Sequence, residues 1–210
     1  MKGMNINMKK RFLGFFTAII LAFSLLLPSV SAVTTKYKVI KGDSLWKISR
    51  RYEVGLDEII SANPQIQNPD LIYPDQIINV PIPDSSITSY EKQVINLVNN
   101  IRAKNGLRRL TSNWQLSRVA RYKSQDMHDR RYFSHNSPTY GSPFDMISAF
   151  NISYRTAGEN IAKGYRSPQA VVDGWMNSPG HRANILNASY TQIGVGFVSD
   201  GYYWTQMFIG

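Results

Sequence analysis

The sequence predicts an α+β protein built from two small domains. Three observations support this fold class. Short runs of alternating apolar residues, the pattern of β-strands, lie both early in the chain and at its end. Helical periodicity lies between them and is clearest in residues 89–104. The length of 210 residues accommodates one ordinary domain or two small ones.

The composition excludes several kinds of protein and of site. Hydrophobic residues make up 43% of the chain and aromatic residues 12%, against 18% charged residues, which excludes wholesale disorder. The chain has no cysteine. A disulfide scaffold, a thiolate metal site and a cysteine nucleophile are therefore excluded.

Residues 1–32 are predicted to be a signal peptide. Four basic residues in 1–11 precede an uncharged apolar run at 12–27, and small residues end the segment at Ala32. The run is short for the ~20 residues that a bilayer span needs. We therefore expect cleavage after Ala32 rather than a retained anchor, and no transmembrane span thereafter. Cleavage lowers the net charge from +10 to +6, and a secreted chain without cysteine is typical of bacteria.

The elements of the first domain follow in order. Residues 37–40 alternate as a short strand, and Gly42-Asp-Ser44 offers a turn and an N-cap for a helix that starts at Leu45. A second short helix fits Leu56–Ala62, and Ile77–Val80 forms the closing strand. The predicted unit is a two-layer βααβ module.

This module resembles a LysM domain over residues 36–82. The resemblance rests on Tyr37-Lys-Val-Ile-Lys-Gly-Asp-Ser-Leu-Trp-Lys-Ile48, on Asn63-Pro64 and on Ile72-Tyr-Pro-Asp-Gln-Ile-Ile-Asn-Val-Pro81. LysM domains bind glycans that contain N-acetylglucosamine, such as peptidoglycan and chitin. The resemblance implies a shallow groove between two loops. Its implied glycan-binding residues are Gly42, Asp43, Ser44, Leu45, Ile72, Tyr73 and Pro74.

Four positions of the module allow more than one interpretation. Asp75 stands where the family usually has glycine, and we expect the turn to survive because aspartate tolerates positive φ. Leu45, Trp46 and Ile72 could all be core side chains instead of groove residues. We expect Trp46 in the core and the loop residues in the binding groove.

Residues 83–88 are predicted to be a linker. Prolines and hydroxyl residues gather there, and the charge balance shifts. Residues 33–85 carry 6 basic and 7 acidic residues, whereas residues 86–210 carry 14 basic and 7 acidic ones. Six extended residues reach ~20 Å, so the two domains are expected to lie close together.

The second domain, residues 89–210, is predicted to begin with helices. Apolar residues recur at helical spacing through 89–104, and Asn105-Gly106 is a C-terminal stop. A second helix has one apolar face between Leu116 and Met127, in which Lys123 is the odd member. Serine–proline pairs at 167–168 and 178–179 mark two further helix starts.

The chain ends in a predicted β-hairpin. Residues 193–197 and 203–209 alternate, and Asp200-Gly201 makes the turn between them. Gly194 and Gly196 leave one sheet face bare, so that a helix or loop can approach closely.

This second domain resembles the CAP superfamily, which includes cysteine-rich secretory proteins and plant pathogenesis-related proteins. The resemblance rests on Arg131-Tyr-Phe-Ser-His135, on Ala157-Gly-Glu159-Asn-Ile-Ala162 and on Ser178-Pro-Gly-His181-Arg-Ala-Asn-Ile-Leu186. It implies an α-β-α sandwich with a cleft in which His135, Glu159 and His181 converge. Ser178 stands where other members have a second glutamate, so that a cluster of four is reduced to three.

Three interpretations of this trio stay open. Two imidazoles and a carboxylate suit a divalent metal such as zinc, although no cofactor is certain. The same side chains could act as a general acid and base, or they could form a structural or binding cleft. His181 is expected near the positive end of a short helix, where the field disfavours imidazolium. His128 is expected to be a solvated helix residue.

A basic run in residues 102–131 holds nine of the domain's fourteen positive charges. Such a run is usually a solvated face. It could also attract anionic wall polymers, while a nucleic-acid partner is unlikely after export.

The sequence therefore predicts a secreted bacterial protein of the cell wall or spore envelope. We expect it to bind peptidoglycan or another N-acetylglucosamine glycan and to present its second cleft to an unidentified ligand. We expect a binding protein rather than an enzyme, because the acid/base set has lost a member at Ser178. The alternative is a metal-dependent hydrolase that acts on wall or protein substrates through His135, Glu159 and His181.

Overall fold

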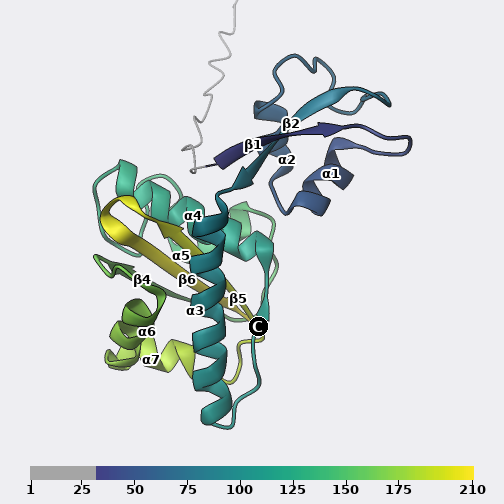
Figure 1. Cartoon of the computed structure of the whole chain (residues 1–210). Helices are drawn as coiled ribbons and strands as arrows, with labels where there is room; N and C mark the ends of the chain where they lie inside the picture. The colour runs from purple at the N-terminus through teal and green to yellow at the C-terminus, as the bar shows by residue number, and fades with distance from the viewer. Residues whose placement is uncertain (1–31) are drawn as a thin grey trace, which may run out of the picture.

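The computed structural model describes residues 32–210, which form two domains (Figure 1). The predicted signal peptide lies outside the described residues, apart from Ala32. Among the helices of residues 32–210, none is both long enough and apolar enough to cross a membrane. The mixture of helices and strands confirms the predicted α+β class.

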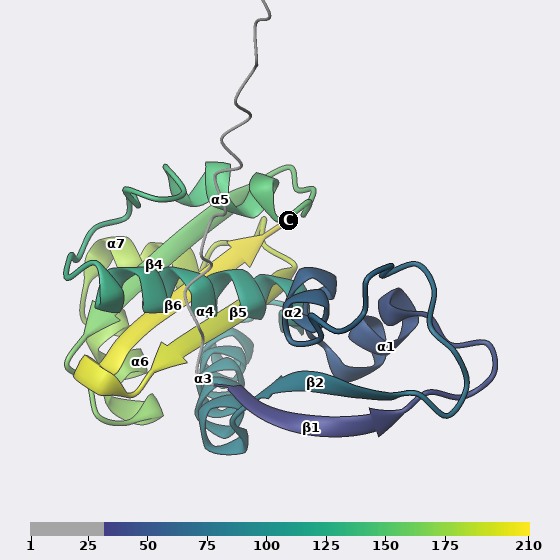
Figure 2. The same cartoon turned by 90° about the horizontal axis from the view of Figure 1, so that it is seen from above.

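The first domain has the predicted βααβ order. Its elements are β1 (Ala32–Lys38), α1 (Leu45–Tyr52), α2 (Leu56–Ser61) and β2 (Ile77–Pro83). The two strands are antiparallel, with Tyr37 opposite Ile78. Both helices lie on the same side of the hairpin (Figure 2). Their inner faces close a small core together with Ile78 and Val80, which are fully buried.

The first strand is displaced from its predicted range of residues 37–40. It covers Ala32–Lys38 because β2 continues to Pro83 and offers pairing partners to the residues before Tyr37. Val39 leaves the ladder and exchanges hydrogen bonds with the 72–76 loop: its N–H donates to Gln76 O, and its carbonyl accepts from the Asp75 N–H. The strand therefore ends where this loop begins to use the backbone of Val39.

The segment predicted as a linker, residues 83–88, is regular structure. β2 ends at Pro83, and α3 (Ser85–Lys104) begins two residues later. The Asp84 carboxylate accepts from the Ser86 N–H at 2.7 Å and so caps this helix. The helix therefore starts before residue 89, and only Asp84 lies between the two elements.

The second domain contains a four-stranded sheet with the order β3-β5-β6-β4. The strands are β3 (Thr111–Ser112), β4 (Ala157–Lys163), β5 (Gln192–Val198) and β6 (Tyr203–Ile209). β5 and β6 form the predicted hairpin, and the Asp200–Tyr202 turn places Gly201 at φ 73°. β4 pairs antiparallel with the far edge of β6.

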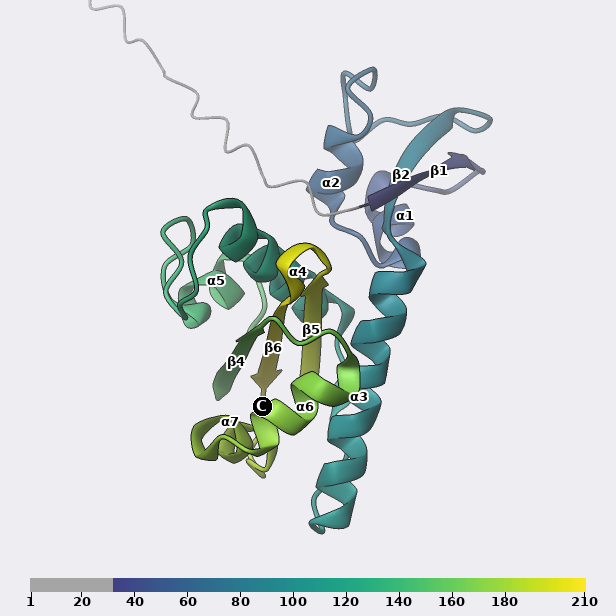
Figure 3. The same cartoon turned by 60° about the vertical axis from the view of Figure 1, so that its left-hand side comes forward.

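Helices cover both faces of this sheet (Figure 3). On one side lie α3, α6 (Pro168–Met176) and α7 (Pro179–Ile185). On the other lie α4 (Trp114–Asp129) and α5 (Pro143–Ala149). The arrangement is the α-β-α sandwich that the resemblance implies.

The two glycines of β5 let α4 lie directly on the sheet. A Cβ built on Gly196 would be 2.1 Å from the backbone of Ala120 and Arg121, and one on Gly194 would be 2.4 Å from the backbone of Leu116 and Ser117. No side chain fits in these gaps. The expectation of a close approach at these glycines is confirmed, and the approaching element is the helix that supports the site described below.

The domains contact each other through Arg118 of α4. Its Nη2 donates to Asp57 Oδ1 at 2.7 Å, and its Nε donates to Glu58. Tyr122, one turn further along α4, donates to the same Glu58 carboxylate at 2.7 Å. The Arg118 guanidinium also lies over the Tyr122 and Phe150 rings. The domains therefore lie against each other, as the short connection predicts.

Candidate functional site

The first candidate site is the pair of loops that the LysM resemblance marks. The 41–44 loop is held by Asp43, whose carboxylate accepts from Tyr37 Oη at 2.6 Å and from the Ile40 N–H at 3.1 Å. Arg51 adds an ion pair at 3.1 Å. Burial alone would raise the pKa of Asp43, but the hydrogen bonds from Tyr37 and Ile40 hold it below its usual value. With 3% of its side chain exposed, Asp43 shapes the loop and offers little surface to a ligand.

The second loop lies beside the first because Val39 bonds to both Asp75 and Gln76. Asp75 adopts φ 71°, so the expectation that aspartate sustains this turn is confirmed. Tyr73 projects from the loop with 60% of its surface exposed, and Pro74 is exposed as well, whereas Ile72 is half-buried. These neighbours form an apolar surface at the loop tips.

The structure divides the predicted glycan-binding residues by exposure. Leu45 is 2% exposed and belongs to the core, so it supports the loop from below. Gly42 is exposed at φ 91°, and Ser44 caps α1 by accepting from the Lys47 N–H at 3.2 Å. Trp46 is 58% exposed, so the prediction that it lies in the core is wrong. It occupies the outer face of α1, whereas Leu45 and Ile48 occupy the inner face.

The second candidate site begins with a buried carboxylate on α4. Asp126 accepts from Ser137 Oγ, Thr139 Oγ1 and Tyr132 Oη, each at 2.6 Å. Burial alone would raise its pKa, but these hydrogen bonds hold the pKa below its usual value. Asp126 therefore fastens residues 132–139, the loop that carries His135, to the helix.

Lys123 supports the same loop from one turn earlier. Its ammonium donates to the His135 carbonyl at 2.7 Å and to Tyr132 Oη at 3.2 Å, and the residue is 1% exposed. Burial lowers the pKa of Lys123, while the nearby Glu159 and Asp126 charges oppose that shift. In the sequence, Lys123 stands out as the one charged residue on an apolar helix face. Asp126 does not stand out, because its hydrogen-bond partners lie on a loop that reaches it only in the folded domain.

His135 and Glu159 form the centre of this site. The His135 Nδ1 and Glu159 Oε1 atoms are 2.7 Å apart. Glu159 lies on β4 with 2% of its side chain exposed, whereas 53% of the His135 side chain is open to solvent. When Nδ1–H donates to the carboxylate, Nε2 faces outward as the ring's available acceptor. Glu159 Oε2 is buried and has no hydrogen-bond partner within the described chain.

His181 lies on α7 beside this pair. Burial is the main cause that lowers its pKa, and the His135 charge adds to the effect. The expected direction is therefore correct, and the causes that the structure shows are burial and a neighbouring imidazole. Asn160 holds the helix in place by donating to the His181 carbonyl at 3.1 Å. His128 lies on α4, as expected, with 30% of its side chain exposed. Hydrogen bonds to the Asp129 and Asp200 carboxylates raise its pKa.

The trio does not form a metal centre in this arrangement. Two imidazoles and a carboxylate suit Zn²⁺ in kind. However, no group of three His, Cys, Asp or Glu residues within 32–210 could hold a metal ion. His135 and Glu159 are hydrogen-bonded to each other, whereas the His181 side chain has no hydrogen bond to either of them within residues 32–210. The His135 charge lowers the pKa of His181. The zinc site therefore stays a prediction that the geometry of these residues does not fit.

Comparison with known families agrees with both resemblances. The profile of the cysteine-rich secretory protein family, CAP, matches residues 95–208. The chain belongs to the CAP family. The profile of the LysM domain matches residues 37–81. The first domain is therefore a LysM domain, and the sandwich that contains His135, Glu159 and His181 is a CAP domain.

Individual relatives share parts of this chain. The Bacillus subtilis protein YkwD is 60% identical over 126 residues, which cover 60% of this chain and 49% of YkwD. An extracellular protein of Bacillus anthracis that contains an SCP domain is 35% identical in structure-based comparison, with a TM-score of 0.57, and covers 64% of this chain and 46% of that one. The spore coat assembly protein ExsA of Bacillus cereus is 51% identical over 41 residues, 20% of this chain and 6% of ExsA. The CAP match thus spans about half the length of YkwD.

Proposed function

We propose that this protein is exported and retained on the cell wall by its LysM domain. Its ligand there is the N-acetylglucosamine glycan of peptidoglycan, bound between the 42–45 and 72–74 loops. The CAP domain then presents the His135–Glu159 pair to a second ligand at the wall or spore envelope. In this proposal the protein is a binding or assembly factor of that envelope.

The exposed Tyr73 beside a rigid backbone loop carries the glycan proposal. A sugar ring has apolar C–H faces and polar edges, so it is recognised by an apolar surface next to backbone donors and acceptors. Tyr73 supplies the apolar surface with 60% exposure. The Asp43 hydrogen bonds fix the neighbouring 40–43 backbone, whose peptide groups can meet the polar edges. Little conformational entropy is then lost on binding.

Export and a location in the cell envelope are supported by other observations. The apolar run at 12–27 with its basic flank has the pattern of a signal peptide, and the related Bacillus anthracis protein is described as extracellular. The likeness to ExsA concerns 41 residues and a spore coat assembly protein. These observations favour the envelope and leave the choice between wall and spore to experiment.

The geometry of the His135–Glu159 pair supports recognition rather than turnover. His135 Nε2 is an exposed acceptor held by a buried carboxylate, which suits a ligand hydroxyl or amide N–H. The His181 imidazole, whose pKa is lowered, stays neutral beside it at pH 7 and adds a second donor and acceptor. A hydrolytic role through a bound metal is not supported by the spacing of these residues.

Sedimentation with purified, insoluble peptidoglycan tests the proposal. The secreted form should pellet with the sacculi, and Tyr73→Ala should weaken retention about tenfold, because an exposed aromatic anchor is lost without disturbing the core. Phe144→Ala is the matched control, since Phe144 is also exposed, at 46%, but lies on α5 of the CAP domain. A protein that stays in the supernatant, or a Tyr73→Ala variant retained like the control, would contradict the LysM assignment of this ligand.

A further inference from the structure

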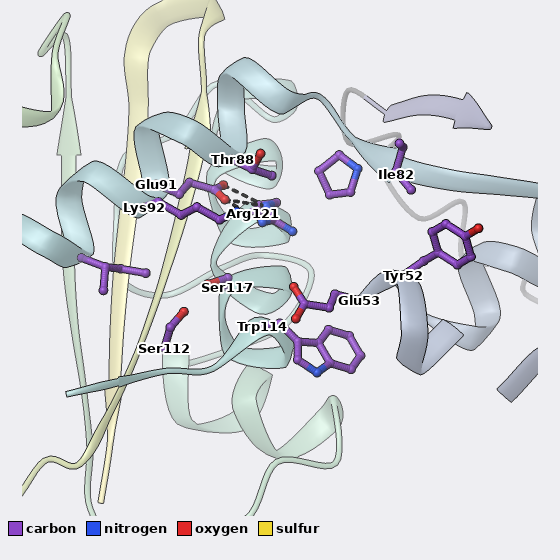
Figure 4. Close-up of a pocket in the computed structure, with 12 residues that line it drawn as sticks. Tyr52, Glu53, Ile82, Thr88, Glu91, Lys92, Ser112, Trp114, Ser117 and Arg121 are labelled. Carbon is purple, nitrogen blue, oxygen red and sulfur yellow. Dashed lines mark hydrogen bonds and ion pairs between the residues drawn. The ribbon is translucent and has the colours of Figure 1, made fainter. Parts of the chain in front are cut away.

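A pocket of about 220 Å³ lies where the two domains meet (Figure 4). It is enclosed by the end of α1, the end of β2, the first turns of α3 and α4, and the edge strand β3. Neither domain forms it alone. Its lining residues are Tyr52, Glu53, Ile82, Pro83, Thr88, Glu91, Lys92, Ile95, Ser112, Trp114, Ser117 and Arg121.

An aromatic wall bounds this pocket on the side of α4. Trp114 is half-buried, and its indole faces the pocket below Glu53 (Figure 4). The Arg50 guanidinium lies 5.6 Å from the centre of this ring and 5.9 Å from that of Trp46. Arg50 thus joins the two indoles, one from each domain, into a continuous surface that starts on α1 and ends in the pocket.

The pocket floor is a buried ion pair. Arg121 donates through Nε and Nη2 to Glu91, the shortest contact being 2.6 Å, and Glu91 is 2% exposed. In the part of the chain that the structure describes, the Arg121 Nη1 group has no protein acceptor, so it is available to a ligand oxygen. Two acidic side chains (Glu53 and Glu91) balance two basic ones (Lys92 and Arg121) among the lining residues.

These features favour a neutral, polar ring as the ligand. The balanced charge gives an anionic polymer no net attraction, and Glu53 would repel it at the entrance. A flat indole beside hydroxyl, guanidinium and carboxylate groups matches a pyranose with an N-acetyl arm, because such a ring has an apolar face and a polar rim. A pocket of this size has room for one such ring.

We propose that this junction is a second glycan subsite, which takes an N-acetylhexosamine unit of the same chain that the LysM loops hold. The inference rests on the proposed function of those loops. The helix α1, of 8 residues, spans ~12 Å between the loop at Ser44 and the pocket residue Tyr52. A glycan of several units covers that distance along Trp46 and Arg50. The Arg118 contacts to Asp57 and Glu58 hold the two subsites in one register.

Calorimetric titration of residues 32–210 with chitotetraose and chitooctaose tests the subsite. Trp114→Ala should weaken binding of the octamer about tenfold and leave the tetramer unchanged, because a tetramer seated between the loops leaves too few units to cross the ~12 Å of α1, whereas an octamer has enough. Ser112→Trp provides a second variant with little risk to folding. Ser112 is exposed on the edge strand, and the larger side chain fills the pocket. Phe144→Ala is again the control and should bind both oligomers like the wild type.

A longer oligomer can also bind the loops in more registers, so tighter binding of the octamer does not by itself show a second subsite. The comparison of each variant with the wild type decides the result. If both variants bind chitooctaose as tightly as the wild type does, the second subsite is overturned while the LysM proposal stands. If the wild-type protein fails to bind chitotetraose, the LysM proposal itself fails. Loss of octamer binding in Trp114→Ala and Ser112→Trp, with intact tetramer binding, supports the subsite.

Discussion

Replacing Asp126 by asparagine should release the loop that carries His135. The Asp126 carboxylate accepts three O–H donors at 2.6 Å and an Arg130 Nε–H at 3.0 Å, with 2% of the side chain exposed. An amide keeps one acceptor oxygen and adds two N–H donors that face these hydroxyl groups. The Asp126→Asn variant therefore loses most of a charged network without a large change of volume.

The size of this effect follows from the number of bonds. Hydrogen bonds to a charged group contribute ~1.5–3 kcal/mol each to the free energy of unfolding. If the amide retains about half of the three hydroxyl bonds, the loss is about 3 kcal/mol. With a denaturant slope near 2 kcal/mol per molar urea, the unfolding midpoint should fall by about 1.5 M.

Urea titration followed through the buried indoles of Trp175 and Trp204 measures this loss in the CAP domain. Asp129→Asn is the control: its carboxylate is 40% exposed and pairs with His128 on the surface, so the expected change is below ~1 kcal/mol. A loss in Asp126→Asn no larger than that of the control would refute the reasoning.

The same comparison should depend on pH. The folded pKa of Asp126 is held below its unfolded value of about 3.9, because hydrogen bonds to the carboxylate outweigh its burial. A carboxyl of this kind stabilises the fold fully above its unfolded pKa and ceases to do so as pH falls through the folded pKa. The difference in free energy of unfolding between the wild type and Asp126→Asn should stay constant above about pH 5 and shrink below about pH 4.

Three further predictions follow from the described contacts. Gly196→Ala would place a Cβ 2.1 Å from the Ala120 backbone, so α4 must shift. Urea titration should show a loss of about 3 kcal/mol in the free energy of unfolding. Gly180 has open space around it, so Gly180→Ala should show no comparable loss. Arg118→Ala removes the ion pairs with Asp57 and Glu58 at the domain interface, and scanning calorimetry should resolve two transitions further apart than in the wild type. An unchanged thermogram would contradict a stabilising role of these ion pairs. The pKa of His181 is lowered, so NMR should find it titrating below about 6.5. Protonation of His181 then opposes folding, so the free energy of unfolding should fall as pH drops below that value. His181→Gln should lack this contribution. Titration of His181 above 6.5 would contradict the described burial.

Much of the fold could be predicted from local patterns. The hairpin of β5 and β6 follows from alternation around Gly201, whose positive φ a two-strand turn requires. Gly194 and Gly196 predict that a helix or loop approaches the bare strand face, although only the structure shows that α4 is this element. The hairpin and the bare strand face are patterns of residues close together in the sequence, and the sequence therefore contains them.

Other features depend on contacts between distant residues and were predicted incorrectly or missed. Trp46 is apolar and lies on a helix, which favours a core position, yet it faces outward toward Trp114 because Leu45 and Ile48 take the inner face. The 83–88 segment has a linker-like composition, but Asp84 caps a helix there. α3 then packs Val94 and Val98 against the sheet of the CAP domain, a contact between residues far apart in the chain.

By itself, the sequence determined the two families, the βααβ and α-β-α orders of elements, and the candidate residues His135, Glu159 and His181. The tertiary structure decided that His135 contacts Glu159 and that the His135 charge lowers the pKa of the neighbouring His181. It also created the pocket between the domains, which residues of α1, β2, α3, β3 and α4 line. Distances between segments far apart in the chain are fixed by packing and ion pairs, such as those of Arg118, and no local pattern of residues contains them.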